Sequence, residues 1–257
     1  MSKQRHGSIR LVLSIATVLS LPAAVFAQVN VITSGGFAAV WQEILPEFEK
    51  TTGITVTTAR GPSQGNGPNT IGAQLRRGVS ADVVILAREG LDELIAEGRI
   101  AAKTDVDLAE TPLGVAVRAG AAKPDISTVD AFKQALLRAK GINFPSSTTG
   151  IYMTDKLFPR LGIARELSGK IKDSGIGALV SGESEIAVQP VSELLHMPGV
   201  DFVGPVPAEI QYVSVFSTAM VAGSKEPESA RRLLAFLTSE SAKTAIRKHG
   251  MEPPRSR

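Results

Sequence analysis

The sequence of 257 residues contains no cysteine. Disulfide bonds, a lipid anchor on a lipoprotein cysteine and a cysteine nucleophile are therefore excluded. Histidine is also scarce, with three residues in the chain, and His6 lies close to the N-terminus. The other two, His196 and His249, are too far apart in the sequence for a zinc site of common spacing. We accordingly predict no bound metal and no cofactor.

Two familiar catalytic motifs are missing as well. The sequence has no Gly-x-Ser-x-Gly elbow, and its glycine-rich stretch at residues 61–67 lacks the Lys-Ser/Thr pair of a phosphate-binding P-loop. An excess of positive charge is also absent once the N-terminus is set aside. The formal net charge of +3 comes from Lys3, Arg5 and Arg10, and the remaining sequence has 25 residues of each sign. Nothing in this balance points to a nucleic-acid partner.

The N-terminus has the pattern of a secretory signal peptide. Three basic residues precede an apolar run at residues 11–25, and Val25-Phe26-Ala27 has the small residues that signal peptidase prefers. A membrane anchor is the alternative, but the run is shorter than about 20 residues and Pro22 interrupts it. We therefore expect residues 1–27 to be removed and the protein to reside in a bacterial periplasm.

The mature sequence begins with an alternation of strand-like and helix-like segments. Residues 29–33 and 54–58 are apolar or β-branched, and an amphipathic segment at 37–50, closed by Gly53, separates them. This order predicts a β-α-β unit with parallel strands. A strand at 82–86 and helices near 70–77 and 88–97 extend it, so the first hundred residues are typical of a doubly wound α/β lobe.

A second α/β set follows and predicts a second lobe. Its expected strands are 113–118, 142–144, 186–188, 200–203 and a long stretch at 210–222, and its expected helices are 127–140, 152–161, 175–181 and 191–195. Two strongly helical segments, 226–237 and 239–249, end the chain. No internal repeat is evident.

Two short clusters rich in hydroxyl groups and glycine, at residues 34–37 and 146–150, each follow a strand and precede a helix. The free N–H groups of helix N-termini bind anions, although ordinary helix capping uses the same residue types. In doubly wound sheets, ligands lie at the carboxyl ends of strands. We therefore expect one cleft formed by Ser34, Gly35, Gly36, Phe37, Gly61, Pro62, Ser63, Arg88, Ser147, Thr148, Thr149, Gly150 and Gln189.

Three of these residues have an alternative role. Arg88 supplies positive charge, but it is also spaced to pair with Asp92 along a helix. Gln189 can reach a ligand oxygen, or it is simply a polar residue before a helix. Phe37 can form a wall of the cleft together with Tyr152, but an aromatic residue at the start of a helix is more often part of the core.

The mature chain resembles the periplasmic solute-binding proteins of ABC transporters, in particular the molybdate-binding group. The phrases at residues 29–37, 46–53 and 78–84 and the helices at 226–248 carry the resemblance. It implies a type II two-lobed α/β fold, in which each lobe is a doubly wound mixed sheet with flanking helices. Two hinge crossings are implied near Thr111 and Tyr212. They divide the chain into lobe 1 (28–111 plus 213–257) and lobe 2 (112–212).

The family also implies a monomer that binds a small anion and delivers it to the membrane permease of an ABC transporter. The loop at residues 34–37 differs from the Ala-Ala-Ser-Leu pattern of molybdate binders, and Arg88 takes the place of a small residue. Because a guanidinium clamps carboxylates, these departures favour an organic polyanion. The phrases at 34–39, 61–63, 191–194 and 198–201 are similar to the branch that includes bacterial aconitate isomerase.

Two functions follow from this resemblance. The first is a receptor that captures a small organic acid anion, such as the tricarboxylate aconitate, or an oxyanion for uptake. The alternative is an isomerase that interconverts trans- and cis-aconitate in the same cleft, which needs a base that removes a methylene proton. Glu193, His196 and Tyr212 are the acid/base candidates. His196 is equally explained as a cation at a helix end.

Overall fold

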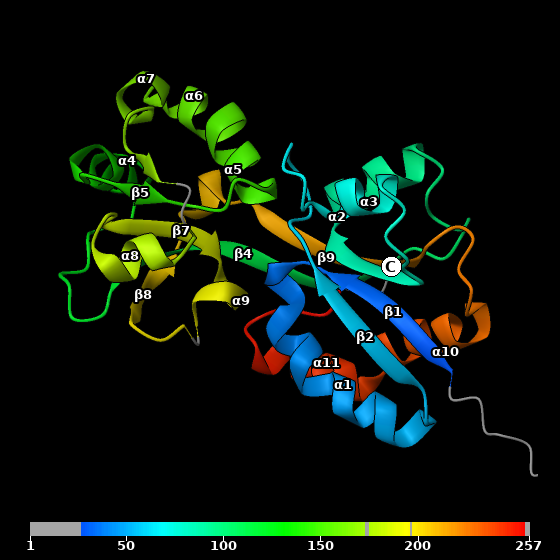
Figure 1. Ribbon diagram of the computed structural model, residues 1–257. Coiled ribbons are helices and arrows are strands. Elements are labelled where there is room, and N and C mark those ends of the chain that lie inside the picture. Colours follow the sequence, from blue (N-terminus) through cyan, green and yellow to red (C-terminus); the bar gives the residue numbers. More distant parts are fainter. Residues whose placement is uncertain (1–26, 173–174, 196, 255–257) are drawn as a thin grey trace, which may run out of the picture.

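The computed structural model describes residues 27–172, 175–195 and 197–254 (Figure 1). The predicted signal peptide, apart from Ala27, and the candidate His196 lie outside these ranges. Within them, no helix combines the length and apolar character that a membrane span requires.

The first β-α-β prediction is confirmed. Strands β1 (Gln28–Thr33) and β2 (Thr55–Arg60) pair in parallel, and α1 (Ala38–Thr52) connects them after the 3₁₀ turn η1 (Gly35–Phe37). Gly53 ends α1 in the left-handed conformation, with φ of 71°, as glycine does at helix C-termini.

The remaining elements of the first lobe complete a mixed sheet with helices on both faces (Figure 1). They are α2 (Ile71–Arg76), β3 (Val83–Ala87), α3 (Arg88–Ala96), β9 (Val213–Met220), α10 (Pro227–Leu237) and α11 (Glu240–Lys248). Along β3, Val83 and Ile85 pack with α1, α10 and α11, whereas Val84 and Leu86 pack with α2 and α3. Both faces are buried because side chains alternate along a strand, and this explains the continuous apolar run.

The second lobe repeats this architecture around a smaller sheet. Its elements are α4 (Val129–Arg138), β5 (Ile142–Asn143), α5 (Thr148–Tyr152), the π-helix η2 (Met153–Leu157), α6 (Phe158–Leu161), α7 (Ala164–Leu167), β6 (Ile171–Lys172), α8 (Gly177–Ser181), β7 (Ile186–Pro190), α9 (Val191–Leu194), β8 (Val200–Pro205) and η3 (Ala208–Ile210). The predicted helix at 152–161 therefore begins earlier, at Thr148, and includes a π-helical turn.

One long strand, β4 (Val106–Arg118), belongs to both lobes. Its first half pairs with β9, and its second half, from Leu113 onward, pairs with β7 and β8. The sequence prediction placed the start of this strand at Leu113 and missed the first half, because polar residues such as Asp107 and Glu110 hide its pattern. The partner change occurs beside Thr111, where a hinge crossing is expected; the lobe boundaries themselves stay a prediction.

Candidate functional site

A cavity of about 450 Å³ lies between the two lobes. It brings together loops that are far apart in the sequence, at the carboxyl ends of β1, β2, β3, β5 and β7. Nine of the residues expected from the sequence line it: Ser34, Gly35, Gly36, Gly61, Pro62, Ser63, Ser147, Thr148 and Thr149. The acid/base candidate Glu193 lines it too, together with Arg60, Asn69, Ala87, Pro145, Ser146, Gly175, Ser214 and Phe216.

Two buried hydroxyl groups in this lining have no hydrogen-bond partner in the part of the chain that the structure describes. Ser34 and Thr148 are 3% and 8% exposed, and neither the Oγ of Ser34 nor the Oγ1 of Thr148 contacts a donor or acceptor among the described residues. A buried hydroxyl without a partner costs about 1–3 kcal/mol. Because the two side chains come from different lobes and line one cavity, a ligand with several oxygen atoms can satisfy both.

Two other hydroxyl groups hold the loops in place. Ser63 Oγ accepts a 2.9 Å hydrogen bond from the amide of Ala87, and Ser147 Oγ accepts a 3.2 Å hydrogen bond from the amide of Gln64. The second bond joins the two lobes directly. In both cases the hydroxyl acts as acceptor, so its own proton remains available for donation.

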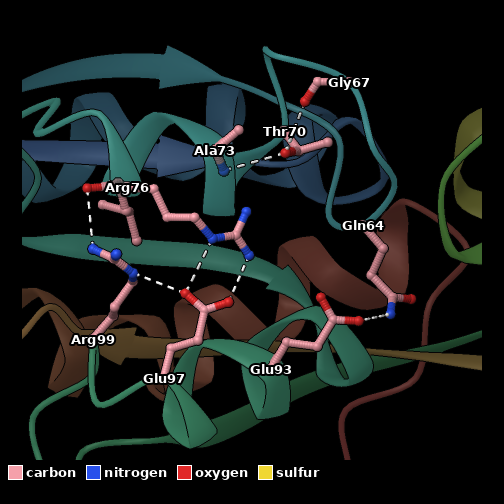
Figure 2. A network of polar contacts seen from close by, with 9 residues as sticks. Gln64, Gly67, Thr70, Ala73, Arg76, Glu93, Glu97 and Arg99 are labelled. Atoms are coloured by element: carbon pink, nitrogen blue, oxygen red, sulfur yellow. Dashed lines mark hydrogen bonds and ion pairs between the residues drawn. The ribbon is translucent and has the colours of Figure 1, made fainter.

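The loop that carries Gln64 is fixed from the other side by a polar network (Figure 2). The Nε2 of Gln64 donates a 2.6 Å hydrogen bond to Glu93 on α3, and Thr70 caps the first turn of α2 through the amide of Ala73. In the same view, Glu97 binds the guanidinium groups of Arg76 and Arg99. The bond between Gln64 and Glu93 therefore ties the loop to α3 directly after Ser63, and Glu97 ties α2, which follows the loop, to the end of α3.

Close packing explains two glycines of the predicted clusters. A Cβ atom on Gly36 would lie 2.1 Å from the ring of Phe216, and one on Gly150 would lie 2.4 Å from the carbonyl oxygen of Pro145. Neither position has space for a side chain. Gly150 is not part of the cavity lining and instead lets α5 pack against the loop before it.

The two arginines near the cleft differ in their surroundings. Arg88 pairs with Asp92, Asp105 and Asp107 at 2.8, 2.9 and 3.4 Å and does not line the cavity. Burial alone lowers the pKa of Arg88, but the hydrogen bonds with Asp92 and Asp105 outweigh it and raise that pKa. The alternative role of Arg88, an ion pair with Asp92, is therefore present in the structure.

Arg60, which the sequence reasoning missed, is the arginine of the cavity wall. It ends β2 and pairs in register with Thr33, directly before Ser34. Its guanidinium forms no hydrogen bond or ion pair within the described part of the chain, so its positive charge is available to a ligand. The clue in the sequence was a basic residue at the carboxyl end of a strand, immediately before Gly61-Pro62-Ser63.

Glu193 places a carboxyl group in the same cavity. It lies in the first turn of α9, and burial raises its pKa to about 7. It has no hydrogen bond or ion pair with any residue that the structure describes. The neighbouring Ser192 fixes α9 to the first lobe, because its Oγ donates a 3.2 Å hydrogen bond to the carbonyl of Gly36.

Besides Arg88 and Gly150, three further candidates from the sequence lie outside the lining. Phe37 is fully buried in the core of the first lobe, with its ring centroid 6.4 Å from that of Phe216. Gln189 donates a 3.1 Å hydrogen bond to the Oδ1 of Asn143. Tyr212 donates a hydrogen bond to Glu89 and stacks on Tyr152, and burial raises the pKa of its hydroxyl further above the ordinary value, so it remains protonated.

Comparisons with known proteins agree with this fold. A family model described as bacterial extracellular solute-binding protein matches residues 29–252. An aconitate isomerase from Pseudomonas sp. is 39% identical over 245 residues, covering 94% of this chain and 94% of that relative.

Solved structures show the same fold at lower identity. The periplasmic molybdate-binding protein of Azotobacter vinelandii superposes with a TM-score of 0.72 at 20% identity, covering 88% of this chain and 100% of that chain. A periplasmic thiamin binding protein superposes with a TM-score of 0.69 at 19% identity, covering 91% of this chain and 86% of that chain.

Proposed function

Because the chain belongs to the family of bacterial extracellular solute-binding proteins, with the type II fold, we propose that it is an exported protein whose cleft binds a tricarboxylate and isomerises it, as an aconitate isomerase. The relative with that activity matches over nearly the whole length of both chains. The cavity supplies the positive charge of Arg60 and the unpartnered hydroxyls of Ser34 and Thr148, which suit a ligand with several carboxylates.

The observation that carries the enzymatic proposal is the carboxyl group of Glu193 in an anion cavity. A receptor that only binds an anion gains nothing from a carboxylate in the wall, since like charges repel. A reaction that moves a proton needs such a group, and a pKa of about 7 lets it both accept and return a proton near neutral pH.

The proposed chemistry is an allylic proton shift. The Glu193 carboxylate removes a proton from the methylene carbon of aconitate, and the electron pair of the broken C–H bond spreads over the three-carbon unit and the adjacent carboxylate. Arg60 and the hydroxyls of Ser34 and Thr148 stabilise this charge. The protonated Glu193 then returns the proton to the carbon at the other end. The double bond moves, no atom is lost, and the geometry of the new double bond follows the rotation of the former methylene arm.

Proton NMR in D₂O tests this proposal directly. Purified protein is incubated with trans-aconitate, and the appearance of the cis isomer is followed together with its methylene signal. We expect conversion, with deuterium at the methylene carbon only to the extent that the protonated Glu193 exchanges with solvent before it returns the proton. Unchanged conversion by the folded variant Glu193→Gln contradicts a shift through Glu193, and a complete lack of conversion by the natural chain contradicts the isomerase.

The second candidate is a receptor for ABC-type uptake from the periplasm, and the family match favours it. Such a receptor captures an organic acid or an oxyanion between its lobes and delivers it to a permease. A melting-shift screen with trans-aconitate, citrate, molybdate and sulfate separates the candidates. Stabilisation by an anion without any turnover supports the receptor and identifies its class of ligand.

A further inference from the structure

A second cavity, of about 550 Å³, lies within the second lobe and shares no residue with the cleft. It is formed by the end of β4 and the turn that follows, the C-terminal half of α4, the end of α8 and the start of β7. In Figure 1, α4 and α8 lie at the end of this lobe that points away from the first lobe. We propose that this cavity is a second binding site, specific for a short monocarboxylate.

Two arginines give the site its positive charge. Arg118, at the end of β4, and Arg138, in the last turn of α4, both line the cavity. Neither guanidinium forms a hydrogen bond or ion pair with a residue in the described ranges. The Nη1 of Arg118 lies over Gly182, 3.6 Å from the position that a Cβ atom on this glycine would occupy. Two guanidinium groups on opposite elements can hold one carboxylate between them.

An independent observation is the hydroxyl of Ser184, which lines the same cavity. Ser184 is 1% exposed, and its Oγ has no hydrogen-bond partner among the described residues. Its backbone is held in place, because its amide donates a 3.0 Å hydrogen bond to the carbonyl of Ala178. A buried hydroxyl without a partner beside two unpaired arginines is the arrangement expected of a site for an oxygen anion.

The remaining lining determines the size and charge of the ligand. Glu185 adds one negative charge, and its Oε2 accepts a 3.0 Å hydrogen bond from the amide of Lys140. Among the residues that line the cavity, two arginines against one carboxylate leave a single positive charge, and Asp125, next to the lining residue Pro124, offsets part of the charge of Arg138. This balance suits a monoanion better than a tricarboxylate. The apolar part of the wall has Val117 and Ile186 and, for the rest, small residues that leave space for a short alkyl chain: Ala121, Ala122, Pro124, Ala135 and Ala139.

This site is independent of the proposed isomerase activity. Strand β7 begins in the second cavity at Ile186 and ends at Pro190, where α9 carries Glu193 into the cleft. Substitutions of Arg118 and Arg138 therefore leave the residues of the cleft unchanged. A failure of the second site and a failure of the isomerase are distinguishable, because each is measured with its own ligand.

Methyl NMR of the protein with labelled alanine provides the test, because alanines form the cavity wall. Propionate is the probe, and propionamide, which has the same shape without the charge, is the matched control ligand. We expect propionate to shift the methyl signals of Ala121, Ala122, Ala135 and Ala139 in a saturable way, and propionamide to shift them little. In the double variant Arg118→Gln/Arg138→Gln, the affinity for propionate falls about tenfold or more.

Two further variants complete the experiment. Ser184→Ala weakens propionate binding without changing the fold, and Arg165→Gln, an exposed arginine of the same lobe outside the cavity, leaves binding unchanged. The spectrum without ligand shows whether each variant is folded. No saturable shift with propionate, equal shifts with propionamide, or unchanged affinity in the folded double variant overturns the proposal.

Discussion

Ser192 donates a hydrogen bond of 3.2 Å from its Oγ to the backbone carbonyl of Gly36, 156 positions earlier in the sequence. The bond joins α9 of the second lobe to the first loop of the first lobe. Because Glu193 follows Ser192 directly, the bond also places this carboxyl group opposite the loop that carries Ser34. The carboxyl group of Glu193 and the hydroxyl group of Ser34 thus line one cavity from different lobes.

Replacing Glu193 with Gln is expected to abolish turnover while leaving ligand binding intact. The amide keeps the size of the side chain but cannot accept the methylene proton, so kcat falls by about a hundredfold or more. The measurement is the rate of cis-aconitate formation, together with the thermal stabilisation by trans-aconitate. Glu166→Gln, at an exposed site on α7, is the control. Full activity of Glu193→Gln assigns the base to another group.

The same carboxyl group predicts a pH dependence of stability. Its pKa is raised from 4.5 to about 7 in the folded protein, so the folded state binds the proton more tightly than the unfolded chain. The free energy of unfolding therefore falls as the pH rises between these two values, and the loss is complete above about 7. Over this window we expect the free energy of unfolding of Glu193→Gln to increase relative to that of the natural chain, by about 1–3 kcal/mol. Urea unfolding measures this difference. If the difference in the free energy of unfolding between the two proteins does not change with pH, the pKa of Glu193 is not raised.

Removing the charge of Arg60 is expected to weaken binding of the anion. Arg60→Gln keeps the length of most of the side chain but removes the charge-assisted bond to a carboxylate, so the Kd for trans-aconitate rises about tenfold to a hundredfold. Isothermal titration measures this change. Arg232→Gln, an exposed arginine on α10, should bind as the natural chain does. If both variants bind equally well, Arg60 does not contact the ligand.

The unpartnered hydroxyls predict opposite effects on stability and binding. Ser34→Ala and Thr148→Val remove buried polar atoms without partners, so the protein without ligand should gain up to about 1 kcal/mol. Affinity for the anion should fall at the same time. Ser63→Ala is the contrasting variant, because its Oγ accepts the amide of Ala87, and it should lose stability. Chemical unfolding and titration on the three variants give the comparison.

Replacing Arg88 tests the interpretation of its ion pairs. Arg88→Gln leaves Asp92, Asp105 and Asp107 without their shared cation, and we expect a loss of about 1–2 kcal/mol in the free energy of unfolding. Because Arg88 does not line the cavity, the Kd for trans-aconitate should change less than twofold. A large loss of affinity with unchanged stability would show that Arg88 contacts the ligand.

The helices and strands that form the cleft could be predicted because their patterns are local. The continuous apolar run of β3, the left-handed Gly53 after α1 and the hydroxyl-glycine clusters each depend on residues a few positions apart. The carboxyl-end rule for doubly wound sheets then predicts that several of these loops lie together. The short strand β6 was not predicted, because its two residues are too few to show a hydrophobic periodicity.

The sequence by itself determined the fold, the order of the loops and the class of residues in the cleft, since hydrophobic periodicity and turn chemistry are local along the chain. Only the tertiary structure decided which side chain has which partner. Arg88 forms ion pairs with Asp105 and Asp107 outside the cavity, and Gln189 donates a hydrogen bond to Asn143. The side chains of Arg60 and Glu193 have no partner among the residues that the structure describes. These choices depend on distances between segments that no local pattern encodes, because electrostatic and hydrogen-bond energies are set by spatial proximity.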